Sequence, residues 1–186
     1  MEEKMEQKLG TFTLGEKAMV SDPCYKDGDQ VVFVEPGEWA AYVAYNDEGR
    51  VTHLIAHHTK FNTYKCLSEG NFRFITDEMN VDSGQMAICD LEHFNPNDDS
   101  EYEKYCYATN SEDSGGLIEN YAAVSCTGWG DGKYTLFGAY KRYKTNSDRM
   151  KVPVYYSLML EFIPDEDLYD EDWEDYEDYE YKYWED

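Results

Sequence analysis

The stretch Ala122–Tyr143 constrains the fold of this chain more than any other part of the sequence. On each side of Asp131-Gly132, apolar side chains alternate with other residues, which is the pattern of a half-buried β-strand. Aspartate and glycine both tolerate the positive φ angles of a two-residue type I′ turn. The stretch therefore predicts a β-hairpin that turns at these two residues.

A second hairpin is predicted closer to the N-terminus. Glu38–Tyr45 and Arg50–His58 alternate in the same way on the two sides of Asn46-Asp47-Glu48-Gly49. The alternation places four apolar side chains on one face of the first strand, namely Trp39, Ala41, Val43 and Tyr45. We expect that face to be buried.

The histidines and cysteines do not favour a metal site. His53 and His57 fall on one face of a predicted strand, where four residues separate them by ~13 Å, too far to share one ion. The five cysteines are widely spaced and include no CxxC pair. We expect hydrogen-bonded or solvated histidines, free thiols, and no metal or other cofactor.

Short alternating runs continue along the rest of the chain. Asp98 or Ser100 can cap one short helix over Glu101–Ala108, and Val152–Ile163, which is apolar on both faces, is typical of a central strand. Further strands are expected at Thr11–Leu14, Lys17–Ser21, Val31–Val34, Phe72–Ile75 and Met86–Cys89. Residues 1–164 are therefore predicted to form one all-β domain: about nine or ten mainly antiparallel strands in a sandwich or partly open barrel, with one short helix.

Acidic side chains dominate the composition. The 186 residues include 40 acidic and 16 basic side chains, a formal net charge of -24, together with 18 tyrosines. This charge opposes binding to nucleic acid or to an anionic membrane, so the expected partners are basic proteins or small ligands. The sequence shows neither a secretory signal nor the ~18 apolar residues of a membrane span, and we expect a cytoplasmic protein.

The segment 165–186 is compositionally distinct, with 13 acidic residues, one lysine and seven aromatic residues. Carboxylates can take the place of phosphates on a basic surface, and aromatic rings can fill pockets or stack on arginines. The alternative is an acidic appendage that binds nothing specific. If the segment binds a partner, the contacts are expected from Tyr169, Asp172, Trp173, Glu174, Asp175, Tyr176, Tyr179, Tyr181 and Trp184.

Polar residues also gather around two predicted turns. Asp82 and Gln85 flank a Ser-Gly turn, where hydrogen bonds to the turn backbone are the simpler interpretation and a polar ligand pocket is the alternative. The candidate pocket residues are Cys24, Asp82, Ser83, Gln85, Trp129, Asp131 and Tyr134. They form no catalytic signature, so a non-enzymatic protein is favoured.

Three motifs together resemble a known family. They are Ser21-Asp22-Pro23-Cys24-Tyr25, Val81-Asp82-Ser83-Gly84-Gln85 and Gly128-Trp129-Gly130-Asp131-Gly132-Lys133-Tyr134. The set is similar to that of a family of small β-rich proteins of unknown function from bacteria, phages and mobile elements, with a DSGQ … GxGDGxY motif pair, over roughly Leu9–Pro164. The resemblance implies a compact β domain and a context in which proteins counter host defences, and it carries over no catalytic residues.

Three functions are compatible with these features. The favoured one is an intracellular binding or inhibitor protein whose acidic aromatic surface occupies a nucleic-acid-binding site on a basic host or defence protein, for example an anti-CRISPR protein. The second is a small-ligand-binding protein or hydrolase with a pocket around Asp82, Gln85 and Asp131. The third is an immunity protein against a bacterial toxin.

Overall fold

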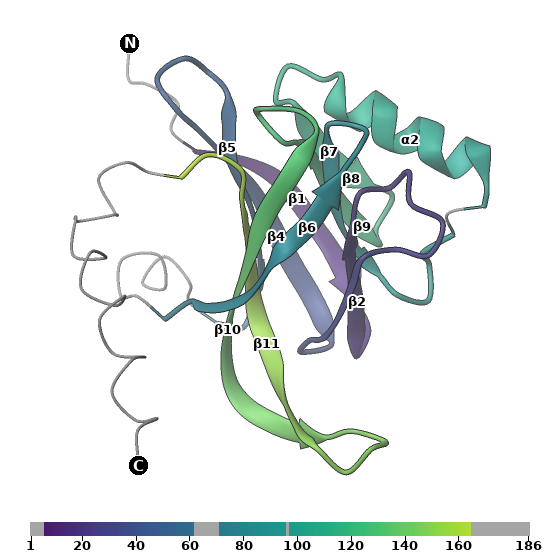
Figure 1. Ribbon diagram of the computed structural model, residues 1–186, viewed down its shortest axis with the longest axis vertical. Helices are drawn as coiled ribbons and strands as arrows, with labels where there is room; N and C mark the ends of the chain where they lie inside the picture. The colour runs from purple at the N-terminus through teal and green to yellow at the C-terminus, as the bar shows by residue number, and fades with distance from the viewer. Residues whose placement is uncertain (1–5, 62–70, 96, 165–186) are drawn as a thin grey trace, which may run out of the picture.

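Two antiparallel sheets make up the described part of the chain, which covers residues 6–61, 71–95 and 97–164 of this computed structural model (Figure 1). One sheet has six strands in the order β1-β4-β5-β11-β10-β6, and the other has five in the order β3-β2-β7-β9-β8. The strands are β1 Glu6–Leu14, β2 Lys17–Ser21, β3 Gln30–Phe33, β4 Gly37–Tyr45, β5 Val51–His58, β6 Arg73–Val81, β7 Gln85–Asp90, β8 Gly115–Ile118, β9 Ala122–Cys126, β10 Gly132–Thr145 and β11 Lys151–Glu161. The sheets do not close into a barrel. The predicted all-β, mainly antiparallel fold with one short helix is confirmed, with eleven strands in the described residues.

The main core lies between the two sheets. Leu54, Leu136 and Leu158 of the six-stranded sheet join Val20 and Ile88 of the five-stranded sheet in one apolar cluster, and all five are fully buried. Successive side chains of a strand point to opposite faces, so each strand contributes every second residue to this core. Full burial of such a side chain contributes about 1.5–3 kcal/mol.

Helix α2 (Asp99–Thr109) covers the outer face of the five-stranded sheet (Figure 1). Its Tyr105 packs in a second apolar cluster with Ile118 and Val124. Asp98, one of the two predicted candidates, is the N-cap, and its side chain accepts a hydrogen bond of 2.9 Å from the backbone N–H of Ser100. None of the helical structure in the described ranges has the length and apolar character needed to cross a membrane.

The predicted hairpin of β4 and β5 is confirmed. The two strands pair antiparallel, with Val43 opposite Leu54. Trp39, Ala41 and Val43 are fully buried, and Tyr45 packs against the same core. The alternation of apolar side chains therefore identified the buried face correctly.

The predicted hairpin at Asp131-Gly132 is wrong. β9 pairs with β7 and β8 in the five-stranded sheet, whereas β10 pairs with β6 and β11 in the six-stranded sheet. Residues 127–131 carry the chain from one sheet to the other, and Gly128 and Gly130 bend it with φ angles of 68° and 91°. Alternation located both strands but does not specify which strand pairs with which.

The hairpin partner of β10 is β11, which is a central strand as predicted. β6 pairs with β10 only as far as Gly138, and β5 pairs with β11 only from Ser157 onward. The β10–β11 ladder continues beyond these points to the pair Thr145 and Lys151. The two strands therefore project beyond the sheet as a ribbon (Figure 1).

Candidate functional site

Three turns that are distant in the sequence lie together in the structure. This turn cluster, as we call it, comprises residues 21–25, 81–85 and 127–134. The backbone N–H of Thr127 donates to the carbonyl of Gly84 at 3.0 Å, and Val81 pairs with Gly132 across β6 and β10. The three motif segments of the sequence therefore form one contiguous region.

Asp22 holds two of these turns together. Its Oδ2 accepts hydrogen bonds from the backbone N–H groups of Asp82 and Ser83, both at 2.8 Å. Its Oδ1 accepts hydrogen bonds from the Cys24 N–H at 2.8 Å and from the Ser83 hydroxyl at 2.6 Å. The carboxylate is fully buried, and these four donors replace the water that it loses.

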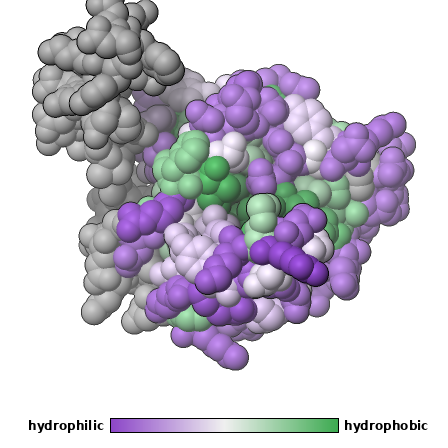
Figure 2. Space-filling view, turned by 60° about the horizontal axis from the view of Figure 1, so that its bottom comes forward, coloured by the Kyte–Doolittle hydropathy of each residue, from purple (hydrophilic) through white to green (hydrophobic). Residues whose placement is uncertain are grey.

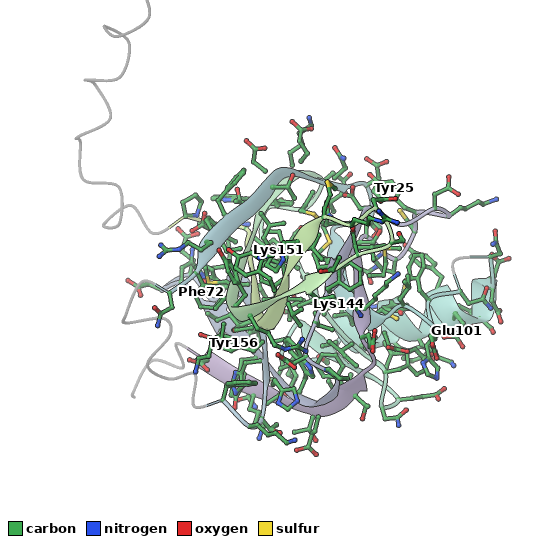
Figure 3. All side chains as sticks on the ribbon, turned by 90° about the horizontal axis from the view of Figure 1, so that it is seen from below. Tyr25, Phe72, Glu101, Lys144, Lys151 and Tyr156 are labelled. Atoms are coloured by element: carbon green, nitrogen blue, oxygen red, sulfur yellow. The ribbon has the colours of Figure 1, made fainter. Side chains whose placement is uncertain are left out.

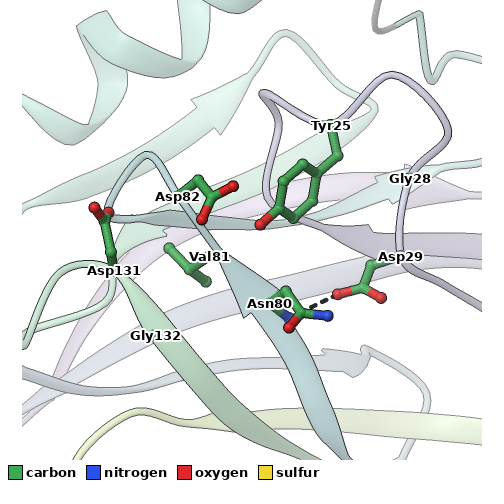
Figure 4. A pocket seen from close by; sticks show the side chains of 8 residues that line it. All are labelled: Tyr25, Gly28, Asp29, Asn80, Val81, Asp82, Asp131 and Gly132. Carbon is green, nitrogen blue, oxygen red and sulfur yellow. Dashed lines mark hydrogen bonds between the residues drawn. The ribbon is translucent and has the colours of Figure 1, made fainter.

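An open depression of about 640 Å³ lies beside the turn cluster (Figure 4). Its polar lining comes from Asp29, Asp82 and Asp131, together with Tyr25 and Asn80. In Figure 4 the ring of Tyr25 stands between two of the aspartates, with its hydroxyl turned toward Asp82. The depression therefore collects carboxylates from three separate parts of the chain.

Burial shifts the pKa of two groups in the depression. It raises the pKa of Tyr25, and the hydrogen bond to the Asp82 carboxylate raises this pKa further, so the hydroxyl remains a donor at neutral pH. Burial also raises the pKa of Asp29, although the carboxylate accepts a hydrogen bond of 2.8 Å from the Asn80 N–H, which lowers it. Carboxylates in this arrangement suit a ligand that donates hydrogen bonds and carries positive charge, such as a guanidinium or an ammonium group.

Two of the seven predicted pocket residues line the depression. They are Asp82, which follows β6, and Asp131, which precedes β10. Ser83 lies in the same turn as Asp82, but its hydroxyl donates to Asp22. The Ser83 hydroxyl therefore links two turns of the cluster.

Gln85 and Tyr134 are buried and do not line the depression. Gln85 lies on β7, and its Nε2 is 3.6 Å from the Cys106 Sγ of α2. The hydroxyl of Tyr134 donates to the carbonyl of Gly130 at 2.8 Å, and its ring contacts Phe162 edge to face with 5.3 Å between the centres. Both side chains support the structure around the turn cluster.

Cys24 and Trp129 lie close to the depression without lining it. Partial desolvation and the Asp22 carboxylate raise the pKa of the Cys24 thiol to about 12. The thiol is therefore protonated at neutral pH, whereas a cysteine nucleophile reacts as the thiolate. Trp129 is 60% exposed, and the guanidinium carbon of Arg50 lies 4.9 Å from its ring centre.

The histidines of β5 have separate surroundings. His57 stacks on Tyr42 with 5.2 Å between the ring centres, and burial lowers its pKa. His53 lies 3.7 Å from Glu161, and His58 is buried. Within residues 6–61, 71–95 and 97–164, no group of three or more histidine, cysteine or acidic side chains is placed to hold a metal ion.

The structure adds residues that the sequence did not single out. Tyr25, Asp29 and Asn80 line the depression, and Asp22 positions its turns. Asp22 had a local signal, because an aspartate before a proline marks a turn. Asp29 and Asn80 are 51 residues apart, and nothing in their local sequence indicates that they meet.

The predicted partner-binding residues between Tyr169 and Trp184 lie outside the described residues. Comparisons with known proteins add no relative, because no family model, no curated protein and no solved structure matches this chain. The resemblance carried by the three motifs stays a prediction. The features that bear on function are therefore the geometry of the turn cluster and the charge of the chain.

Proposed function

We propose that this protein is a non-enzymatic binding or inhibitor protein that occupies the nucleic-acid-binding site of a basic protein. The observation that supports this most is the open depression, which Asp29, Asp82 and Asp131 line with carboxylates, while Trp129, two residues before Asp131, has an exposed ring. Acidic and aromatic groups together complement a surface that normally binds phosphates and bases. An anti-defence protein of a phage or mobile element, acting like an anti-CRISPR protein, is the most specific form of the proposal.

The depression supplies a defined contact for such a partner. Asp82 and Asp131 can accept hydrogen bonds from the two sides of an arginine fork, which matches carboxylates better than a lysine ammonium does. Trp129 adds a flat aromatic surface for a second cation. Arg50 of this chain already lies over that ring, which shows that the indole can hold a guanidinium.

The net charge of -24 should raise the rate at which a basic partner associates with this protein. A strongly anionic protein attracts a cationic surface before contact and speeds the association. Salt shortens this attraction, because the screening length is ~8 Å at physiological ionic strength and ~3 Å at 1 M. Binding is therefore expected to weaken steeply as the salt concentration rises.

A pair of matched double variants of the full chain tests the proposal. Asp82→Asn with Asp131→Asn removes two charges from the depression, and Asp47→Asn with Glu112→Gln removes two exposed charges elsewhere. Each protein is used to capture basic proteins from a host lysate at 0.1 and 0.5 M salt, with and without a nucleic-acid competitor. At 0.1 M salt without competitor, we expect the wild type and the control variant to capture a basic protein, and the depression variant to capture at least tenfold less of it. Either 0.5 M salt or the nucleic-acid competitor should abolish the capture.

Two results would contradict the proposal. One is capture that neither salt nor nucleic acid reduces, because such a partner would not be bound through a phosphate-binding surface. The other is equal capture by both double variants, because the depression would then contribute nothing. A chain that ends at Pro164 measures the contribution of residues 165–186 separately, and unchanged capture by it would assign recognition to the β domain alone.

The same depression favours a second candidate, a site for a small cationic ligand. Asp82 and Asp131 both line it, and carboxylates in a depression can bind a small cation. Titration of the full chain with spermidine or free arginine, followed by calorimetry, distinguishes this candidate. Saturable binding that only the Asp82→Asn and Asp131→Asn variant loses would favour it. A toxin-immunity protein would use the same acidic interface toward a different basic partner.

A further inference from the structure

The tip of the β10–β11 ribbon is positively charged in a negatively charged protein. Residues 141–151 contain five of the 16 basic side chains of the sequence and one acidic side chain, a net charge of +4 in a chain of net charge -24. The five basic residues are Lys141, Arg142, Lys144, Arg149 and Lys151. We call residues 141–151 the basic arm. Figure 3 looks onto its end, where Lys144 and Lys151 are labelled, and Figure 2 shows mainly hydrophilic residues around a small hydrophobic area on this side.

Ion pairs fix the base of the basic arm to the rest of the sandwich. Arg142 donates two hydrogen bonds to the carboxylate of Glu35, at 2.5 and 2.9 Å. Lys144 pairs with Glu16, and its ammonium lies 5.0 Å from the ring centre of Phe33. These contacts orient the ribbon, so its tip has a defined place relative to the two sheets.

The tip of the basic arm has unused binding capacity. Arg149 and Lys151 form no ion pair with any residue that the structure describes. Met150, between these two residues, is 59% exposed, and Tyr143, further along β10, is 55% exposed. The basic arm thus presents two cations together with an exposed aromatic ring and a flexible thioether, which suits an acidic segment that carries aromatic rings.

The β4–β5 turn has the same hydrogen bonds as the β10–β11 turn at the tip, but it has a glycine where the tip has Arg149. Asn146 closes the β10–β11 turn, and its Oδ1 accepts two backbone N–H hydrogen bonds of 3.1 and 2.9 Å. Asn46 closes the β4–β5 turn with the same two bonds at the same distances. The left-handed position is occupied by Gly49, with φ 76°, in one turn and by Arg149, with φ 62°, in the other.

Arg149 is therefore strained where a glycine would fit without strain. A left-handed backbone is unfavourable for a side chain with a Cβ, and the twin turn uses Gly49 at the equivalent position. Strained positions that keep a functional group are often part of a binding site. The left-handed backbone at Arg149 therefore favours a role for its charge beyond folding.

We propose that the basic arm binds the acidic C-terminal segment of its own chain, residues 165–186. This segment has 13 acidic residues and one lysine, a net charge of -12, and seven aromatic residues, so it complements the cations and the exposed apolar groups of the tip. Attachment to the same chain raises the effective concentration into the millimolar range, which makes a weak electrostatic contact sufficient.

The length of the segment permits this contact. The segment begins after Pro164, close to the end of β11, and the tip lies at the other end of the same strand. Ten residue steps from Lys151 to Glu161 span about 33 Å. A chain of 22 residues can span up to about 75 Å when extended, so it can return along the ribbon to its tip.

The contact would regulate recognition if the proposed function holds. The basic arm offers residues 165–186 the same kind of surface as a basic partner, so a partner that contacts this segment as well as the depression would compete with the arm. Such a partner would have to displace the arm, so a weakly basic protein would bind less well than a strongly basic one.

Nuclear magnetic resonance of the isotopically labelled full chain tests the inference without any partner, so its failure is distinguishable from that of the proposed function. The wild type is compared with a chain of equal length in which the 13 acidic residues of 165–186 are asparagine or glutamine. At 20 mM salt we expect different amide resonances in residues 141–151 and identical ones in the twin turn, residues 46–50. The difference should vanish at 0.5 M salt.

Two results would overturn the inference. The first is identical resonances in residues 141–151 of the two chains. The second is a difference that appears only as the protein concentration rises from 20 to 500 μM, because the segment would then bind a second copy instead of its own chain.

Substitutions at the left-handed position separate charge from strain. Arg149→Gly removes the charge and relieves the strain, so we expect a higher urea midpoint. The resonance difference between the chains with the acidic and the neutralised segment 165–186 should fall to half or less. Arg149→Lys keeps the charge and should keep the difference. Gly49→Arg places a cation in the twin turn and should lower the midpoint. An undiminished difference in Arg149→Gly would contradict a contact through the tip.

Discussion

Asp22 illustrates how one side chain can position two distant turns. The proline that follows it restricts the backbone to extended conformations, and the side chain then reaches a turn 60 residues further along the chain. All four of its hydrogen-bond donors come from Cys24, Asp82 and Ser83. The acidic depression therefore depends on a buried carboxylate that does not itself line it.

Asp22→Asn should lower the free energy of unfolding by about 3 kcal/mol, because an amide group would face donors where a carboxylate oxygen accepted their bonds. Urea unfolding measures the effect. Asp27→Asn, in the neighbouring exposed loop, serves as the control and should change the free energy by less than about 0.5 kcal/mol. A loss of less than about 1 kcal/mol in Asp22→Asn would show that the turns hold together without the charge.

At the residue scale, the sequence predicted local roles better than the directions of side chains. The cap Asp98 acts within its own neighbourhood, and it was one of the two predicted candidates. Gln85 was expected beside Asp82, but it points under α2 toward Cys106. Its direction depends on the face of β7 that the helix covers, and this information lies far from Gln85 in the sequence.

The ribbon of β10 and β11 depends on a close approach at Gly138. A Cβ atom at this position would lie 2.4 Å from the ring of Tyr155, which is shorter than any normal contact. Tyr155 also links the ribbon to β3, because its carbonyl accepts a hydrogen bond of 2.8 Å from the N–H of Glu35. The glycine thus allows the ring to lie flat where the ribbon leaves the sheet.

Gly138→Ala should destabilise the protein by about 2 kcal/mol, because the ring of Tyr155 must leave its place. Thermal and urea unfolding both report this loss. The double variant Gly138→Ala with Tyr155→Leu removes the clash and should be more stable than Gly138→Ala alone. If the double variant is no more stable than Gly138→Ala alone, the ring of Tyr155 is not the cause of the destabilisation.

The ion pair at the base of the basic arm should make stability depend on pH. The hydrogen bonds and the positive charge of Arg142 lower the pKa of Glu35, so the folded chain binds this proton less readily than the unfolded chain. The stabilisation is therefore complete above the unfolded pKa of about 4.3 and is lost as the pH falls through the lower folded pKa.

Glu35→Gln should flatten the fall in the free energy of unfolding below about pH 4.3, while Glu112→Gln, an exposed control, should not. Urea unfolding between pH 3 and 6 gives both slopes. The difference is expected to be small, about 1 kcal/mol or less, because Arg142 is half exposed. Parallel curves for wild type and Glu35→Gln would contradict the contribution of the ion pair.

At the element scale, the positions of strands were predictable and some of their partners were not. The five-residue loop between β4 and β5 made one hairpin predictable, because a connection this short keeps two strands side by side. The loop before β10 contains Gly128 and Gly130, which let the chain pass from one sheet to the other. β9 and β10 therefore do not form the predicted hairpin. β8 was not predicted, because Gly115 and Gly116 begin it and glycine is rare in strands.

At the scale of the whole molecule, the composition predicted the fold class. The pairing of strands that are far apart in the sequence could not be predicted. Tyrosine-rich alternating runs favour half-buried sheets, and this is what the structure shows. The pairing of β2 with β7 and of β6 with β10 joins segments that lie far apart in the sequence. Such pairings follow from the packing of the whole core, which local patterns do not reveal.

The net charge of -24 should make the folded state more stable in salt. Like charges repel one another more in the compact chain than in the expanded chain, and salt screens this repulsion. We expect the Tm to rise by roughly 3 °C between 10 mM and 0.5 M sodium chloride. The chain with a neutralised segment 165–186 should respond less, and a lower Tm in salt would contradict the argument.

Asp29 serves the molecule in a way that its place in the depression does not suggest. By accepting the Asn80 N–H, it closes part of the outer margin of β6, and the hydroxyl of Thr76 does the same for the Glu78 N–H. Unpaired backbone groups on an outermost strand invite another chain to continue the ladder, which is how fibrous aggregates begin. A carboxylate that lines the depression therefore also closes part of the margin at which edge-to-edge polymerisation would begin.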